Sequence, residues 1–361
     1  MSQLVVIACG GTGGHLSPGI ALAERLRAGG GEVLLLASRK KVDARLLEKY
    51  PHLPFERAPG AALVASPAGL LRFAWNLAAA VLFAARLVAR RRPAVLVGFG
   101  GFMTLAPALV CRLAGIPVVL HEANRVPGKA VRALSKIASR TWLPAGAEIA
   151  GLPAERAGRA GFPTRSEFAP AARDAARRAL GFPEAGRLLL VVGGSQGARP
   201  LNDWLLANLD ALLRGGTHVL GVLGGGAEGV ERADATNGAQ AKLIPFCDRM
   251  ADALNAADLV VSRAGAGAVA ECAACGAPAV LVPFPQAADN HQEANARHAA
   301  AAGGAVVVAQ GDPRRLTAEV ERLIGDDAAL AAMRAGMLRL REECPWEHFA
   351  DGVAALAARR R

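Results

Sequence analysis

Short apolar runs alternate with longer amphipathic segments along most of the chain. The runs are bounded by glycine, proline or charged residues, a pattern that predicts buried strands, and segments such as 19–28 and 106–114 predict helices between them. We expect strands at 4–8, 32–37, 94–97, 117–121, 188–192, 218–222, 242–245, 259–262, 279–282 and 305–308. Regular alternation of strands and helices predicts an α/β fold of parallel sheets joined by right-handed crossovers.

The strand pattern starts again near residue 186, after a stretch rich in glycine, proline and arginine at 146–170. A chain of 361 residues is longer than one ordinary core requires. We therefore expect an N-terminal domain at 1–160, a C-terminal domain at 161–344, and a final helix at 345–361 that packs back on the first domain. The two halves share no short fixed repeat, which excludes a solenoid.

The formal net charge of +11 favours an anionic partner: nucleic acid, an acidic membrane surface or a phosphorylated substrate. Aromatic residues make up only 4% of the chain and no nucleic-acid motif is present, so nucleic acid is disfavoured. Apolar residues make up 52%, which is ample for sizeable cores.

The six cysteines are scattered, and Cys272 and Cys275 have no second pair at zinc-ligand spacing. We interpret them as structural thiols of a reduced, cytosolic protein and expect no metal site. The first apolar run is too short for a signal peptide. The longest apolar stretch, 73–85, contains Asn76 and is shorter than the roughly 20 residues of a membrane span, so we expect no transmembrane helix.

Three glycine-rich loops follow predicted strands, at 10–15, 193–198 and 263–271. Glycines let backbone approach a ligand closely, and the N-terminus of the following helix offers free N–H groups that suit phosphate. The alternative is a set of tight turns without a ligand. Neither of the first two loops has the spacing G-x-G-x-x-G or G-x-x-x-x-G-K-[ST], which disfavours a nicotinamide oxidoreductase and a P-loop enzyme.

Glu271 closes the third loop, where a carboxylate can accept hydrogen bonds from two ribose hydroxyls. A surface glutamate or one that interacts with the helix dipole is the alternative. The residues alone leave both interpretations open.

Together the motifs resemble the MurG family of UDP-N-acetylglucosamine transferases, glycosyltransferase family 28. The matching segments are GGTGGH at 10–15, GFGGF at 98–102, VVLHEAN at 118–124, VVGGSQGA at 191–198 and the loop 263–271, with DNHQ at 289–292. The resemblance implies a GT-B architecture, two Rossmann-like domains facing a cleft. It implies that domain 1–160 takes the lipid-linked acceptor and faces the membrane, and that domain 161–344 binds UDP-N-acetylglucosamine.

The reaction implied is inverting transfer of N-acetylglucosamine to the C4 hydroxyl of N-acetylmuramate in lipid I, giving lipid II and UDP. No cofactor and no metal are implied, and the chain contains no D-x-D motif. The implied partners are UDP-N-acetylglucosamine, lipid I, the anionic cytoplasmic membrane surface and other cell-wall synthesis proteins, at a peripheral location on the cytoplasmic face of the cell membrane.

The resemblance also implies the substrate-binding residues. They are Thr12, Gly13, Gly14, Asn124, Arg165, Ser195, Gln196, Asn202, Cys247, Ala266, Gly267, Ala268, Val269, Ala270, Glu271 and Gln292. The chain departs from the family pattern at several places. Phe162 stands where an asparagine is common, Ala268 where a threonine is common, and Cys247 where an aliphatic residue is common, and the segment 102–107 is one residue longer than its family counterpart.

His15 and Glu122 are the candidates for the general base that removes the proton of the acceptor hydroxyl. Imidazole titrates near pH 6.5, close to the ideal for such a group, but His15 could instead only position a substrate. Backbone N–H groups of 193–198 and Arg165 are expected to stabilise the leaving diphosphate.

A predicted helix at 70–92 combines bulky apolar residues with arginines, and we expect it to bind anionic membranes. The apolar residues are Leu71, Trp75, Leu82 and Phe83, flanked by Arg72, Arg86, Arg90, Arg91 and Arg92. Three other functions remain open: a GT-B enzyme with a diacylglycerol or small-metabolite acceptor, a UDP-sugar epimerase, and a nucleotide-sugar-binding regulator.

Overall fold

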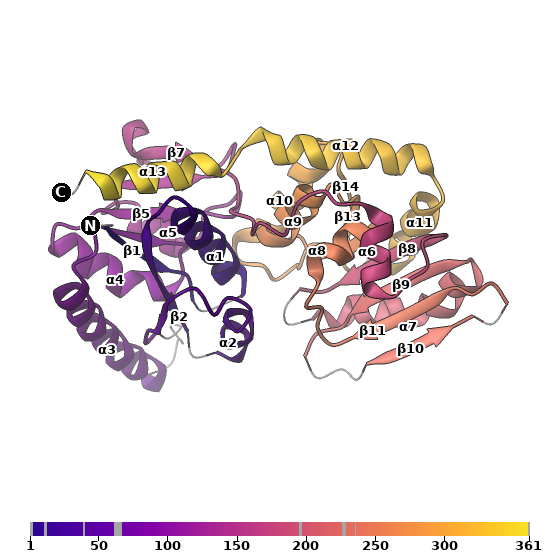
Figure 1. Ribbon diagram of the computed structural model, residues 1–361, viewed down its shortest axis with the longest axis horizontal. Coiled ribbons are helices and arrows are strands. Elements are labelled where there is room, and N and C mark those ends of the chain that lie inside the picture. Colours follow the sequence, from indigo (N-terminus) through magenta and orange to yellow (C-terminus); the bar gives the residue numbers. More distant parts are fainter. Residues whose placement is uncertain are drawn as a thin grey trace. The chain divides into compact units, whose positions relative to one another are not determined.

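The computed structural model describes residues 3–10, 13–38, 40–60, 67–194, 197–225, 229–234 and 236–359. The chain forms two compact units: Met1–Arg165 together with Cys344–Arg361, and Ser166–Glu343. Each unit is a parallel-sheet α/β structure (Figure 1). The chain therefore leaves the N-terminal unit once and returns to it for its last helix.

The described part of the N-terminal unit contains a seven-stranded parallel sheet in the order β3-β2-β1-β4-β5-β6-β7. Its strands are β1 (Leu4–Ala8), β2 (Glu32–Ala37), β3 (Phe55–Arg57), β4 (Val95–Gly98), β5 (Val118–His121), β6 (Arg140–Leu143) and β7 (Ala157–Arg159). Its helices are α1 (Gly13–Ala28), α2 (Lys41–Leu47), α3 (Pro67–Arg91), α4 (Phe102–Leu113), α5 (Lys129–Leu134), the short η1 (Ala154–Arg156) and α13 (Glu347–Ala358).

Side chains of β1 alternate between two cores because successive residues of a strand point to opposite faces. Val5 and Ile7 belong to the core that includes Phe349 of α13, whereas Val6 and Ala8 belong to the core on the other face. Both faces of the sheet are thus covered, which explains why its central strands are continuous apolar runs.

The described part of the C-terminal unit contains a second seven-stranded sheet, in the order β10-β11-β9-β8-β12-β13-β14. Only the edge pair β10–β11 is antiparallel among these strands. The strands are β8 (Arg187–Val192), β9 (Thr217–Val222), β10 (Val230–Ala233), β11 (Gln240–Ile244), β12 (Leu259–Ser262), β13 (Ala279–Leu281) and β14 (Ala305–Val307). The helices are α6 (Arg173–Leu180), α7 (Arg199–Arg214), α8 (Met250–Ala256), α9 (Ala266–Cys275), the short η2 (Ala288–Asn290), α10 (His291–Ala301), α11 (Pro313–Ile324) and α12 (Asp327–Glu343).

All the strands expected from the apolar runs are present, with ends that differ by at most two residues. The strands β3, β6, β7 and β10 were missed. They are short, they lie at or next to a sheet edge, and they carry charged residues or glycine, as in Phe-Glu-Arg at 55–57 and Val-Glu-Arg-Ala at 230–233. The edge strands β3, β7 and β10 need no continuous apolar run, so the pattern gives no signal there. The inner strand β6 is buried but has only four residues, two of them the polar Arg140 and Thr141.

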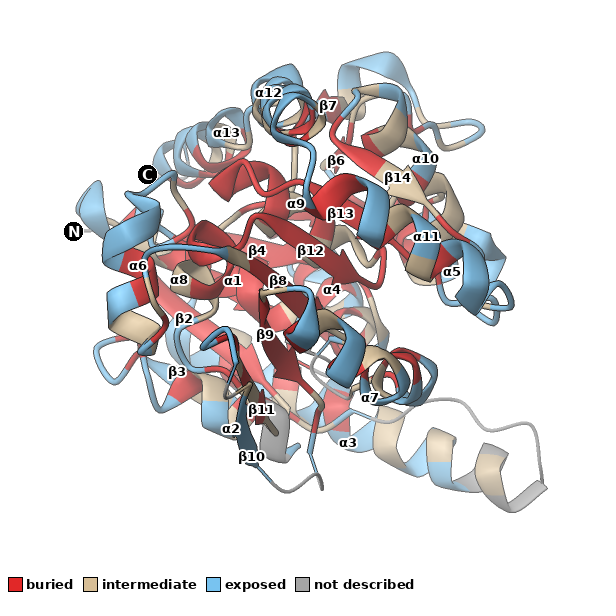
Figure 2. Ribbon diagram, turned by 90° about the vertical axis from the view of Figure 1, so that its right-hand side faces the viewer, coloured by how far each residue is buried: buried red, intermediate tan, exposed pale blue. Residues whose placement is uncertain are grey.

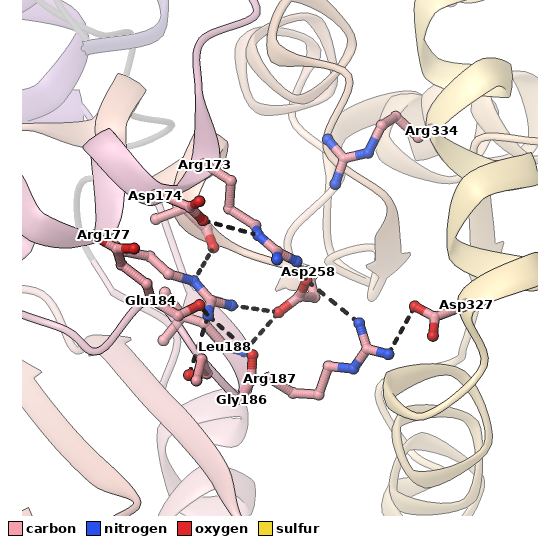
Figure 3. A network of polar contacts seen from close by, with 12 residues as sticks. Arg173, Asp174, Arg177, Glu184, Gly186, Arg187, Leu188, Asp258, Asp327 and Arg334 are labelled. Carbon is pink, nitrogen blue, oxygen red and sulfur yellow. Dashed lines mark hydrogen bonds and ion pairs between the residues drawn. The ribbon is translucent and has the colours of Figure 1, made fainter.

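A buried ionic network ties together the amino ends of β8 and β12 (Figure 3). Asp258 accepts from Arg177 at 2.6 Å, from Arg173 at 2.8 Å and from the backbone N–H of Leu188 at 2.8 Å. Arg177 is fully buried and also donates to the carbonyl oxygens of Ala256, Glu184 and Gly186. The network lies at the edge of the sheet opposite to the glycine-rich loops and therefore has a structural role.

The apolar part of helix α3 is longer than the stretch 73–85 expected from the sequence. Its window Arg72–Arg91 has 20 residues with a mean hydropathy of 1.4, so among the described helices it is long and apolar enough to cross a membrane, by length and composition alone. The same helix packs on its unit through buried Ala80, Ala84 and Leu87, as core helices also do. Figure 2 draws the rest of it mainly as intermediate or exposed.

Candidate active site

The order of the N-terminal sheet creates a switch point between β1 and β4. From β1 the chain continues to β2 and β3 on one side, and from β4 to β5, β6 and β7 on the other. In open α/β sheets ligands bind beyond the carboxyl ends of the strands at such a point. The loops that follow β1 and β4 are the glycine-rich segments 10–15 and 98–102, so the topology brings these two motifs together.

His15 lies directly beside the loop that follows β4. A Cβ atom placed on Gly101 would lie 3.3 Å from Cε1 and 3.5 Å from Nδ1 of the imidazole. His15 is in the first turn of α1, and it is half-buried. Burial lowers the pKa of its imidazole, while the negative charge of nearby Asp43 opposes this shift and Lys40 adds to it. At neutral pH the ring is therefore mainly unprotonated, the form that can accept a proton.

Asp43 is a fully buried carboxylate that sequence reasoning missed. Its Oδ2 accepts from the backbone N–H of Ser38 at 3.1 Å and from the Ser38 hydroxyl at 2.5 Å. Gly10 packs on the same turn, because a Cβ atom at Gly10 would lie 2.3 Å from the Ser38 nitrogen. Asp43 thus supports the turn against which the first glycine-rich loop lies, and its only sequence signal is an acidic residue in the first turn of α2.

Glu122, the other candidate base, holds the loop that follows β5. Its Oε1 accepts from the backbone N–H of Asn124 at 2.8 Å and from the Asn124 side chain at 3.2 Å, and its Oε2 accepts from the N–H of Gly128 at 2.8 Å. Burial raises the pKa of this carboxyl, and these hydrogen bonds counteract the shift. Because both oxygens are occupied by loop N–H groups, the geometry fits loop support better than proton abstraction.

The remaining expected residues of the N-terminal half are placed as follows. Gly13 and Gly14 begin α1, and Thr12 lies outside the described residues. Asn124 is half-buried beside Glu122. Arg165 is the last residue of the N-terminal unit, is buried, and donates to the hydroxyl of Tyr50 at 3.0 Å.

The C-terminal sheet has its own switch point, between β8 and β12, where the chain order again reverses. After β8, Gly197 has φ +74° and its backbone N–H donates to the carbonyl of Gly194. Gly197 has no room for a side chain, because the carbonyl oxygen of Leu223 would lie 2.3 Å from a Cβ atom. Asn202 of α7 donates to the same Leu223 carbonyl at 2.8 Å. Asn202 therefore braces the loop after β9. Ser195 and Gln196 lie outside the described residues.

The loop after β12 leads into the N-terminus of α9. Gly265 precedes the helix, and nothing lies within 4 Å of a Cβ atom placed there. The first turn has no acidic residue, and Gly265 makes no side-chain cap hydrogen bond. The first N–H groups of a helix have no partner within the helix itself, so such an end can donate to a ligand. Ala266, Gly267, Ala268, Val269 and Ala270 form this end of the helix. A helix N-terminus of this kind favours an anion such as a diphosphate.

Three further expected residues belong to the same unit. Glu271 follows on α9 and is half-buried. Cys247 is buried in the core of the unit, so its side chain packs there. Gln292 is the second residue of α10, and its side-chain oxygen accepts from the backbone N–H of Phe284 at 2.9 Å.

Arg263, directly after β12, is a second residue that sequence reasoning missed. It is 8% exposed and donates to backbone carbonyls of the loop that follows β13. The available signal was a charged residue between a buried strand and a glycine-rich turn. No group of three His, Cys, Asp or Glu side chains that could hold a metal ion occurs within the described residues. All six cysteines are free thiols.

The chain has two parallel-sheet units, each with a glycine-rich loop at its switch point. One unit also has a helix N-terminus suited to a diphosphate. This arrangement is that of an α/β glycosyltransferase of the GT-B type. The glycosyltransferase family 28 N-terminal domain matches residues 5–142 and the family 28 C-terminal domain matches residues 188–343. The chain belongs to glycosyltransferase family 28.

Similar proteins agree with this assignment. The UDP-N-acetylglucosamine--N-acetylmuramyl-(pentapeptide) pyrophosphoryl-undecaprenol N-acetylglucosamine transferase of Opitutus terrae is 47% identical over 339 residues, which cover 93% of this chain and 90% of that protein. The enzyme of the same name from Parasynechococcus marenigrum is 38% identical over 93% of this chain and 94% of its own length.

Solved structures show the same fold. The crystal structure of Acinetobacter baumannii MurG has a TM-score of 0.71 and 27% identity, covering 98% of this chain and 100% of that one. The glycosyltransferase of kitacinnamycin has a TM-score of 0.72 at 17% identity, covering 98% and 99% of the two chains, a likeness of fold alone. The expected family and the GT-B fold are confirmed.

Proposed function

We propose that this enzyme transfers N-acetylglucosamine from UDP-N-acetylglucosamine to the C4 hydroxyl of N-acetylmuramate in lipid I, with inversion, to give lipid II and UDP. The observation that carries the proposal is the N-terminus of α9 at the switch point of the C-terminal sheet. This helix end has no side-chain cap and no acidic residue in its first turn, it has open space at Gly265, and Glu271 lies on the same helix. These features suit a diphosphate linked to a ribose.

The C-terminal unit would bind the donor, and the N-terminal unit would bind the lipid-linked acceptor. His15 is the preferred general base, because its pKa is lowered by burial and partly restored by Asp43. Glu122 would keep the loop 122–128 in place, since its two oxygens accept N–H groups of Asn124 and Gly128. The departing UDP gains negative charge, which the first turn of α9 would stabilise electrostatically.

Incubation of the protein with UDP-N-acetylglucosamine and lipid-linked N-acetylmuramyl-pentapeptide tests the reaction. Mass analysis of the lipid should show the gain of one N-acetylhexosamine, with release of an equal amount of UDP. Replacing the acceptor by diacylglycerol is the matched control and should give no product. Transfer to diacylglycerol, conversion of the donor to an isomer, or binding without UDP release would each overturn the proposal in favour of another function.

The second part of the proposal is peripheral binding to an anionic cytoplasmic membrane surface through α3 and α4. Their exposed apolar side chains are Trp75 (79% exposed), Val81, Leu82, Phe102, Leu109 and Leu113 (88% exposed). The helices pack together at one end, where the rings of Phe73 and Phe102 are 5.9 Å apart. Exposed arginines 72, 86 and 90 flank these side chains along α3.

Phe83 and Leu71 of α3 were also expected in this membrane-binding face. Phe83 is half-buried and packs against the core of the unit, so less of its ring is exposed than that of Trp75, and α4 adds other exposed apolar side chains. The side chain of Leu71 lies outside the described residues. Exposed aromatic and leucine side chains add insertion energy, and each nearby arginine adds about 1 kcal/mol on anionic lipid.

Co-sedimentation with vesicles of anionic phospholipid tests this surface. The variant Arg72→Glu/Arg86→Glu/Arg90→Glu should lose salt-sensitive binding. The charge-matched variant Arg314→Glu/Arg315→Glu/Arg322→Glu on α11 should bind like the parent. Equal binding by both triple variants would show that the membrane is bound elsewhere, and resistance of the parent to alkaline extraction would show that α3 spans the bilayer.

A further inference from the structure

Arg263 is an unusual buried cation. It is 8% exposed, and among the described residues no charged neighbour contributes to the shift of its pKa. Burial alone lowers the pKa of its guanidinium. Buried Arg177, by contrast, is paired with Asp258 at 2.6 Å. Burying an unpaired charge costs free energy of folding. We therefore look for a function of Arg263 in the groups that its guanidinium contacts.

The guanidinium connects three loops at the carboxyl edge of the C-terminal sheet. From its own position after β12, Nη1 donates to the carbonyls of Val282 at 3.0 Å and Pro283 at 3.3 Å, directly after β13. Nη2 donates to the side-chain oxygen of Gln310, after β14, at 2.5 Å. A planar group with several N–H donors can make these bonds at once, whereas a lysine ammonium cannot reproduce their geometry.

The same guanidinium also holds Phe284. Its central carbon lies 5.5 Å from the centroid of the Phe284 ring, within the range of a cation–π contact. Phe284 is 41% exposed, so burial in a core does not keep this residue in place. The stacking on Arg263 and the hydrogen bonds to its two preceding residues together fix the position of Phe284.

Phe284 in turn orients Gln292. The backbone N–H of Phe284 donates to Oε1 of Gln292 at 2.9 Å. An N–H group can only donate, so the amide oxygen of Gln292 must face Phe284, and its NH₂ group remains to donate to a ligand. A chain of contacts therefore runs from Arg263 through Phe284 to the side chain of Gln292.

We propose that Arg263 is a positioning residue for donor-sugar recognition, acting through Phe284 on Gln292. The proposal rests on the proposed function and on the expectation, implied by the family resemblance, that Gln292 of the C-terminal unit binds the donor. Uridine and ribose would be recognised by other elements, among them Glu271 of α9. Arg263 therefore governs the discrimination between UDP-N-acetylglucosamine and UDP, and it contributes little to the affinity for UDP itself.

Calorimetric titration of the full-length protein with UDP and with UDP-N-acetylglucosamine tests the proposal. In Arg263→Ala and Arg263→Lys we expect the affinity for UDP to stay within about twofold and the affinity for UDP-N-acetylglucosamine to fall tenfold or more. The matched control is Arg297→Ala on α10, where the arginine is exposed and paired with Glu293, and it should change neither affinity. Amide exchange of the peptide 282–292 should become faster in the Arg263 variants only.

Gln310→Ala removes one acceptor of the guanidinium and gives a milder test if the Arg263 variants do not fold. This variant should lose affinity for UDP-N-acetylglucosamine but not for UDP, and by a smaller factor than the Arg263 variants. An equal loss of both affinities would show that Arg263 acts as a cation on the diphosphate, and unchanged affinities would show that it has no role in binding; both results overturn the proposal. A parent protein that binds neither compound would instead overturn the proposed function.

Discussion

Removing the charge of Asp258 should strongly destabilise the C-terminal unit. In Asp258→Asn, Arg177 loses the carboxylate that pairs with it while remaining fully buried, and one acceptor of the network becomes an NH₂ group facing other donors (Figure 3). Asp258 is only 4% exposed. Arg173 and Arg187 are partly exposed and lose little because water solvates them. The loss of the charge partner of Arg177 should therefore account for most of the effect, and the free energy of unfolding should fall by about 3–5 kcal/mol.

The assay is chemical denaturation, with amide exchange of peptides from β8 and β12 to assign the transition to the C-terminal unit, because two units need not unfold together. Asp327→Asn is the matched control. Asp327 bonds Arg187 of the same network at 2.7 Å but is 84% exposed, so its loss should cost no more than about 1 kcal/mol. Similar destabilisation by the two substitutions would refute the argument that burial of Arg177 sets the cost.

Four further predictions concern the site and the pH dependence. Glu271→Ala should weaken UDP-N-acetylglucosamine binding by about 1.5–3 kcal/mol, the cost of a lost charged hydrogen-bond partner, and unchanged calorimetric affinity in a folded variant would refute the ribose assignment. His15→Ala should lower kcat by about 10²–10⁴-fold with little change in donor affinity, whereas Glu122→Gln should retain more turnover; the reverse order would make Glu122 the base. Asp43→Asn should move the acid limb of the pH–rate profile to lower pH, since Asp43 raises the pKa of His15; an unmoved limb would show that the two groups are not coupled. Burial lowers the pKa of His121 from 6.5 to about 4, so the unfolded chain binds a proton that the folded one does not between these values. Stability should therefore fall as pH drops from about 6.5 toward 4 in the parent, by up to about 1.4 kcal/mol per unit, and less in His121→Gln, as thermal unfolding across this range can check.

The sequence alone was sufficient for the apolar strands of both sheets and for the family. Parallel strands covered on both faces must be continuous apolar runs, so β1, β8 and β12 were evident from local composition. The glycine-rich loops were equally evident, because close backbone approach demands glycine whatever surrounds it. Edge strands such as β3 and β10 carry no such constraint and were missed.

Only the tertiary structure decided which side chains act together. The proximity of Asp43 to His15 depends on how two loops pack beside β1, and nothing in the spacing of 28 positions encodes it. The hydrogen bonds of Glu122 show loop support where the residue type alone suggested a base. Arg263 gains its role from carbonyls that lie 19 and 20 positions away in the chain. Local sequence determines what each segment can form, whereas packing of distant segments determines which polar groups meet, and the chemistry of the site depends on that second step.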